Sequence, residues 1–211
     1  MKRGSVYLLG TMLLCGMLVA MAPLGMSVDF NRNLVIDTNL IGPESSDVYL
    51  EASQAINQKP KHYAVIVGIS DYKAIGDLNF CDEDANDWFS FLTEIGYDEI
   101  VVLGDDTSPY LQHDGMATEH NAKLALNDLV SKASPKDTIA FISSGHGSGD
   151  SRGSSLLCMW DITDGEDGED GLLYDSEFAT IWATAKANTF IFLDHCFAGG
   201  MDSLFNVNDN A

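Results

Sequence analysis

The chain has 211 residues, 45% of them hydrophobic, which is enough apolar material for the core of one domain with terminal extensions. Its 11 basic and 32 acidic residues give a formal net charge of −21 at pH 7. Such a charge repels nucleic acids and anionic membrane surfaces, and it favours cationic partners or divalent metal ions. The composition therefore excludes a disordered acidic chain and argues against nucleic-acid binding.

Residues 1–27 have the pattern of a signal peptide or an N-terminal anchor. Lys2 and Arg3 form a short basic head, and residues 6–22 form an uncharged apolar run. Ala20-Met21-Ala22 has the small-x-small form of a cleavage site, although Pro23 would directly follow the cut, which is unfavourable. We expect a secreted or otherwise extracytoplasmic protein, and a retained membrane anchor is the alternative to cleavage.

Residues 28–60 show no sustained periodicity and are predicted to be a linker or propeptide. From residue 61 to 211, strand and helix patterns alternate in a single domain. The predicted strands cover residues 62–69, 99–103, 138–143 and 188–193, and the predicted helices cover residues 82–95, 118–133 and 175–187. Because these strands are apolar on both faces, they predict a buried, mostly parallel sheet with helices on both sides. Residues 155–160 are predicted to form an edge hairpin.

Two of the predicted strands end on chemically reactive groups. The third strand runs into Ser144-Gly145-His146-Gly147, and the fourth ends on Asp194, His195 and Cys196. Open α/β sheets carry their reactive groups at the carboxyl ends of strands. A cysteine needs a base or a positive partner to form thiolate near neutral pH. We therefore predict a nucleophile–base pair of Cys196 and His146; the alternative for a lone cysteine is a buried packing residue.

The backbone around this pair suits an acyl-transfer site. Glycine at positions 145 and 147 allows the main chain to approach a substrate closely, because no Cβ obstructs it. The N–H groups of Gly147 and Cys196 are the predicted donors to the oxyanion of a tetrahedral intermediate. Cys81 and Cys158 lie in or beside apolar runs and are predicted to be packing residues rather than a disulfide.

The two strand-end motifs together resemble those of the caspase-like cysteine peptidases of C14 type, nearest the prokaryotic caspase homologues and metacaspases. Those proteins carry S-G-H-G after the third strand and D-x-C-x-[SA]-G after the fourth, and residues 78–87, LNFCDEDAND, resemble the beginning of their first helix. The resemblance implies a three-layer α/β sandwich, with Cys196 as the nucleophile and His146 as general base and acid. His195 stands in a variable position of the motif, and strand alternation points its side chain away from that of Cys196.

The resemblance also implies hydrolysis of polypeptides after Arg or Lys. In the family, the aspartate two residues before the nucleophile, here Asp194, lines the pocket that binds the substrate residue before the cut. Asp71 is predicted to line another side of the same pocket. An Asp-selective pocket would need arginine, and Arg152 is the only arginine in the predicted domain. The alternatives are a strand cap for Asp194 and an ordinary turn residue for Asp71.

Residues 161–170, DITDGEDGED, supply the carboxylates on flexible backbone that hard cations prefer. The chemistry itself requires no cofactor, and we predict Ca²⁺ as an activator, as in some metacaspases. The predicted ligands are Asp161, Asp164, Asp167, Asp170 and Asp202. The alternative is a solvated charge run on a loop.

The family's sheet continues for two or more strands after the nucleophile, whereas this sequence ends at Ala211. We therefore expect a caspase-like fold that lacks its C-terminal strands, as a fragment, as a truncated fold, or with the remainder supplied by another chain. Two other functions stay open: a non-catalytic, acidic, calcium-dependent interaction module, and a caspase-like peptidase that cleaves after Asp.

Overall fold

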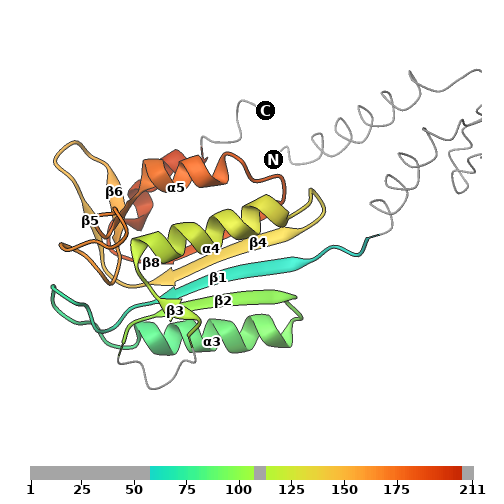
Figure 1. Cartoon of the computed structure of the whole chain (residues 1–211), viewed down its shortest axis with the longest axis horizontal. Helices are drawn as coiled ribbons and strands as arrows, with labels where there is room; N and C mark the ends of the chain where they lie inside the picture. The colour runs from blue at the N-terminus through green and yellow to red at the C-terminus, as the bar shows by residue number, and fades with distance from the viewer. Residues whose placement is uncertain (1–57, 107–112, 206–211) are drawn as a thin grey trace, which may run out of the picture. The chain divides into compact units, whose positions relative to one another are not determined.

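The computed structural model describes residues 58–106 and 113–205, which include most of the predicted peptidase domain (Figure 1). The signal peptide or anchor predicted for residues 1–27 and nearly all of the predicted linker lie outside the described residues, so both stay predictions. Within the described ranges, no helix has the length and apolar character needed to cross a bilayer.

A five-stranded sheet forms the middle layer of the domain. Its order is β3-β2-β1-β4-β8, and every neighbouring pair is parallel. The strands are β1 (His62–Gly68), β2 (Glu99–Gly104), β3 (Gly115–Met116), β4 (Thr138–Ser144) and β8 (Asn188–Asp194). The continuous apolar runs of β1 and β4 are buried on both faces, as parallel strands require. The prediction of a mostly parallel sheet is confirmed.

Helices cover both faces of this sheet (Figure 1). The helix α3 (Cys81–Glu94) packs on one face, where Ala64 and Ile66 of β1 are buried. The helices α4 (Glu119–Lys132) and α5 (Asp175–Trp182) pack on the other face, over Val65 and Val67. Fully burying a valine or isoleucine side chain, such as those of Val65, Ile66 and Val67, is worth roughly 1.5–3 kcal/mol. The alternation along β1 therefore stabilises both outer layers, and the caspase-like three-layer α/β arrangement is confirmed.

The helix α5 is shorter than the predicted helix over residues 175–187. It ends at Trp182, and the N–H groups of Thr184 and Ala185 bond three residues back, to Ile181 and Trp182, as in a 3₁₀ turn. The N–H of Asn188 then donates to the Asp137 carbonyl oxygen at 2.9 Å, which brings the chain to the start of β8. The alanines after Trp182 are good helix formers, but strand pairing decides where this helix ends.

A second, three-stranded antiparallel sheet lies beyond the carboxyl end of β4. Its order is β5-β6-β7, with β5 (Gly147–Gly149), β6 (Ser155–Cys158) and β7 (Leu172–Tyr174). All four residues of β6 are buried, so this segment is a central strand rather than the predicted edge hairpin. Because β5 begins directly after His146, this small sheet supports the backbone of the candidate base.

The strand β8 is more exposed than its apolar sequence predicts. It lies at one end of the strand order and pairs, among the described strands, with β4 alone. Phe190 and Phe192 are 44% and 40% exposed, and the ring of Phe192 contacts Trp88 of α3 at a centroid distance of 5.1 Å. The prediction that β8 is buried was therefore wrong, because its edge position leaves these rings partly uncovered.

Candidate active site

The carboxyl ends of β4 and β8 lie side by side. The last pair of their parallel ladder is Ser144 with Asp194, and the N–H of Gly145 donates to the Asp194 carbonyl oxygen at 3.2 Å. His146 and Cys196 each follow this last pair by two residues. The fold therefore brings together the two strand ends that carry the candidate residues His146 and Cys196.

The glycines that flank His146 are required by close backbone approach. A Cβ added at Gly147 would collide with the carbonyl oxygen of Cys196, so the main chains of these two residues are in contact. A Cβ added at Gly145 would lie 2.6 Å from the hydroxyl oxygen of Tyr72, which is also too close. Both glycines of the S-G-H-G motif therefore make room for neighbouring groups of the site.

The ring of His146 has a defined orientation. Its Nε2 atom lies 2.8 Å from the carbonyl oxygen of Gly76, and its ring packs on that of Tyr72 at a centroid distance of 5.0 Å. A carbonyl oxygen can only accept a hydrogen bond, so Nε2 carries the hydrogen. This leaves Nδ1 as the basic nitrogen of the neutral ring, the state that a general base needs.

The peptide groups of His146 are also held in place. Its N–H donates to the Tyr72 hydroxyl oxygen at 2.6 Å, and its carbonyl oxygen accepts from the N–H of Cys158 at 2.9 Å and from Nδ1 of His195 at 2.8 Å. Burial raises the pKa of Tyr72, so its phenol stays protonated at neutral pH and donates onward to the Cys158 carbonyl oxygen at 3.4 Å. Sequence reasoning missed Tyr72, because the residue lies in a loop far from both motifs.

Cys196 is exposed at a sharp turn. The next residue, Phe197, has a φ of 62°, a conformation that bulky residues rarely adopt, and it bends the chain directly after the cysteine. The free thiols of Cys81 and Cys158 are buried. Burial raises the pKa of the Cys158 thiol to about 11, and burial likewise raises that of Cys81. Among the described residues, Cys196 is therefore the accessible thiol.

We expect iodoacetamide at pH 8 to alkylate Cys196 in the folded chain at least about tenfold faster than Cys158, because a buried thiol of raised pKa forms little thiolate. The measurement is the alkylated fraction of each cysteine-containing peptide against time, by mass spectrometry. In urea the two rates should approach each other. Equal rates in the folded protein would contradict the exposure of Cys196.

A cavity of about 110 Å³ lies where β4, β8 and α3 meet. Asp194 lines it, together with Asp84, Ser144 and Trp88, and the predicted role of Asp194 in substrate binding stays a prediction. The Ser144 hydroxyl donates to Oδ2 of Asp84 at 2.8 Å, which fixes this second carboxylate in the wall. Asp84 was not among the predicted site residues, although it belongs to the LNFCDEDAND segment that carries part of the resemblance.

Asp71 does not line this cavity. It follows β1, where its N–H donates to the buried carboxylate of Asp105 at 3.0 Å. Partial burial and then the negative charges of Asp105 and Asp77 raise the pKa of its side chain. Asp71 is therefore not part of this cavity, and its role in substrate binding stays a prediction. The second carboxylate in the cavity wall is that of Asp84.

The five aspartates predicted as calcium ligands are not gathered into one site. Asp161 is fully buried, with Oδ1 accepting the N–H of Glu119 at 3.1 Å and Oδ2 lacking a hydrogen-bond partner among the described residues. Asp164 lies 3.4 Å from the ammonium group of Lys73, and Oδ1 of Asp170 accepts the N–H of Leu172 at 3.0 Å. Asp167 and Asp202 are exposed. Calcium activation therefore stays a prediction.

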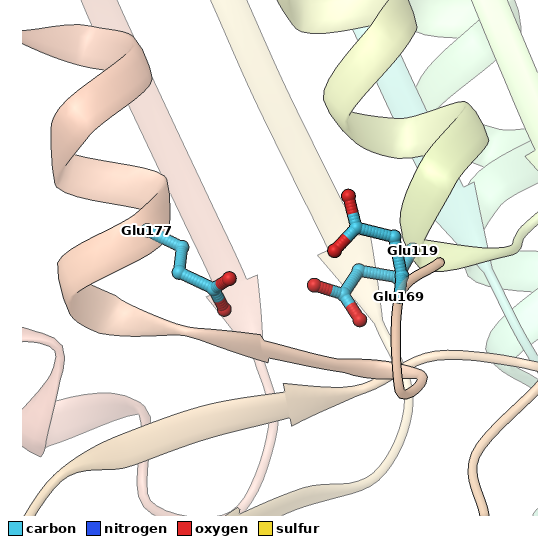
Figure 2. Close-up of side chains that lie close together, drawn as sticks. All are labelled: Glu119, Glu169 and Glu177. Carbon is cyan, nitrogen blue, oxygen red and sulfur yellow. The ribbon is translucent and has the colours of Figure 1, made fainter. Parts of the chain in front are cut away.

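Among the described residues, a different acidic group has oxygen atoms that converge within 4.8 Å, and it consists of Glu119, Glu169 and Glu177 (Figure 2). These side chains come from α4, the acidic loop and α5 and point toward one another. The ammonium group of Lys123 lies 2.5, 2.8 and 2.9 Å from their carboxylates, in that order. A lysine therefore already supplies the positive charge at this position.

A parallel sheet that carries histidine and cysteine on adjacent strand ends, beside an acidic cavity, defines a caspase-like domain. Comparison with known families agrees: residues 62–203 match the family model described as metacaspase, peptidase C14 domain. The chain belongs to this family of cysteine peptidases.

Individual relatives support the same placement. The chain is 32% identical to Metacaspase-1 of Kluyveromyces lactis over 142 residues, which cover 65% of this chain and 29% of that protein. It is 34% identical to Metacaspase-1 of Saccharomyces cerevisiae over 122 residues, which cover 56% of this chain and 25% of that protein. The matched part therefore spans less than a third of each relative.

A solved structure, protein GSU0716 from Geobacter sulfurreducens, has a similar fold. Its TM-score is 0.53 at 21% sequence identity, and the match covers 65% of this chain and 51% of that one. At this identity the likeness concerns the fold alone.

Proposed function

We propose that the protein is a cysteine endopeptidase that cleaves polypeptides after Arg or Lys. The observation that carries the proposal is the contact between the strand ends of β4 and β8, which sets the backbone of Gly147 against that of Cys196 and places His146 beside them. Membership of the peptidase C14 family supports the same chemistry.

In the proposed mechanism, Nδ1 of His146 takes the thiol proton as the Cys196 sulfur attacks the peptide carbonyl carbon. The tetrahedral intermediate collapses as His146 gives the proton to the leaving amine, so the C–N bond breaks and a thioester remains. A water molecule, deprotonated by the same histidine, then hydrolyses the thioester and restores the thiol. The bond from Nε2 of His146 to Gly76 supports this role, because it holds the ring in the tautomer with basic Nδ1.

The direction of the Gly147 N–H supports its role as an oxyanion donor. Cys158 donates to His146 across the small sheet, so this pair is a hydrogen-bonded one. In an antiparallel ladder the next pair, Gly147 with Leu157, is then not hydrogen-bonded, and its N–H points away from β6. A backbone donor turned out of the ladder in this way is suited to stabilise a developing negative charge.

The cavity beside the dyad supports the preference for a basic residue before the cut. Asp84 and Asp194 present two carboxylates, which pair well with a guanidinium or ammonium group, and Trp88 adds an aromatic face for a cation. Arg152, which an Asp-selective pocket would need, does not line the cavity; its side chain is 82% exposed and bonds to Asp150 at 2.9 Å.

We expect the Asp194→Asn and Asp84→Asn variants to lower kcat/KM for an Arg peptide by roughly tenfold or more each, because each removes a hydrogen bond between charged groups, worth roughly 1.5–3 kcal/mol. The measurement compares fluorogenic peptides that differ only in Arg, Lys or Asp before the cut. Asp71→Asn is the matched control and should leave the ratio of Arg to Asp cleavage unchanged. A wild-type protein that prefers the Asp peptide would contradict the basic pocket and favour the Asp-specific alternative.

A further inference from the structure

His195, which directly precedes Cys196, is bonded through both ring nitrogens. Its Nδ1 lies 2.8 Å from the His146 carbonyl oxygen, and its Nε2 lies 2.8 Å from the hydroxyl oxygen of Ser143. Because the carbonyl oxygen can only accept, Nδ1 carries the hydrogen, and Nε2 of the neutral ring accepts from the serine. Burial lowers the pKa of His195, which favours this neutral form at pH 7.

The side chain of His195 continues the connection between the two strands where their backbone ladder ends. The last ladder pair is Ser144 with Asp194, and beyond it the His195 ring reaches both Ser143 within β4 and His146 after its end. The flanking glycines make room for it. A Cβ at Gly145 would lie 3.2 Å from Cε1 of His195, and one at Gly147 would lie 3.0 Å from its Cβ.

The hydrogen bond from His195 comes from a different part of the chain than the other hydrogen bonds to the peptide groups of His146. Tyr72 comes from the loop after β1, and Cys158 comes from the small sheet. His195 is the neighbour of the candidate nucleophile, so its bond sets the position of the His146 backbone relative to Cys196 directly. A displacement of about 1 Å between reacting groups can cost on the order of 100-fold in rate.

We propose that His195 is a positioning residue, whose Nδ1–H holds the His146 carbonyl so that the base and Cys196 keep their reactive geometry. The proposal rests on the proposed peptidase function. It assigns a role to the residue before the nucleophile, whose side chain does not itself need to contact the substrate or the thiol.

Two variants separate this role from simple packing. In His195→Asn the side-chain amide nitrogen can take the place of Nδ1, whereas in His195→Gln the longer side chain places its amide near the position of Nε2. We expect the Gln variant to lose about 10- to 100-fold in kcat with little change in KM, and the Asn variant to stay within about threefold of wild type. Equal kcat values for Asn, Gln and wild type would overturn the proposal, as would equal losses in both variants.

A second readout does not need turnover. The rate of Cys196 alkylation by iodoacetamide is measured from pH 5 to 9 in the full chain, by mass spectrometry of the Cys196 peptide, and the melting temperature confirms that each variant is folded. We expect the rise in rate to move to higher pH in His195→Gln and to stay in place in His195→Asn, because the thiol loses its base only in the former. A lower melting temperature with an unchanged pH profile would show a structural role only. If the wild type hydrolyses no peptide, the proposed function fails, and the alkylation profiles still decide the role of His195.

Discussion

Replacing Cys196 with alanine is expected to lower peptide hydrolysis by about four orders of magnitude or more, because in the proposed mechanism its sulfur forms the covalent intermediate. The other thiols in the described residues, Cys81 and Cys158, are buried. The measurement is the initial rate of hydrolysis of a fluorogenic Arg peptide, at a protein concentration high enough for the reduced rate to be detected.

The fold should be unchanged in this variant. Cys196 is exposed, so its removal creates no cavity, and the free energy of unfolding should stay within about 0.5 kcal/mol of wild type. Cys15→Ala, which removes a thiol ahead of the domain, is the matched control and should keep the full rate. Hydrolysis that survives in Cys196→Ala would exclude the proposed mechanism. Intact folding with no hydrolysis in the wild type either would favour the non-catalytic interaction module.

The proximity of the two candidate residues, His146 and Cys196, could be predicted from sequence because it depends on strand order and strand ends. Continuous apolar runs identified β4 and β8, and the glycines after them marked where each strand stops. Parallel neighbours end at the same edge of a sheet, so His146 and Cys196 had to lie close to each other once the two strands paired.

The parts of the site that could not be predicted depend on contacts between segments far apart in the chain. Tyr72 and Gly76 contact His146 from a loop 70 or more residues earlier, and no local pattern marks them. Asp84 is one of several acidic residues in the first turns of α3, where the helix dipole alone would explain it. Its place in the cavity wall appears only when α3 packs against β4.

The convergence of charge around Lys123 was missed for the same reason. Four of the five predicted calcium ligands were chosen by composition within one loop, and Asp202 was chosen from the family resemblance. The carboxylates that meet come instead from two helices and that loop (Figure 2). Composition showed that a cation would be favoured near these residues. It could not show that Lys123 of the same chain already occupies the position.

Glu119 is the member of this cluster on which the fold should depend most. Its side chain is 1% exposed, and its Oε2 accepts the N–H groups of Asp170, Gly171 and Leu172 at 2.9–3.2 Å while Oε1 pairs with Lys123. Burial raises the pKa of Glu119, although the ammonium group of Lys123 acts to lower it. The free-energy cost of desolvating the carboxylate therefore exceeds the stabilisation that its pairing with Lys123 provides. The compensation comes from the three backbone donors. Glu119 is the acceptor for the N–H groups of Asp170 and Gly171, whereas the N–H of Leu172 also donates to Oδ1 of Asp170.

We expect Glu119→Gln to destabilise the protein by about 3 kcal/mol, because an amide has one acceptor oxygen and cannot serve the backbone donors and Lys123 together. For a domain of this size, the loss corresponds to a fall in Tm of roughly 6–12 °C. Urea unfolding followed by circular dichroism measures the first quantity, and a thermal scan measures the second. Peptide hydrolysis should fall as well, since residues 170–172 lead into β7, which pairs with β6, the strand that supplies the Cys158 bond to His146.

Glu177→Gln is the matched control, because Glu177 contacts the same ammonium group at 2.9 Å but its side chain is 39% exposed. Exposed ion pairs are worth about 0–1 kcal/mol and are screened by salt, so this variant should lose little stability, and less still in 1 M salt. The loss in Glu119→Gln should persist at high salt, since buried hydrogen bonds carry it. Equal losses in the two variants, both removed by salt, would mean that the cluster acts through surface charge alone and that the backbone bonds of Glu119 do not hold the acidic loop in place.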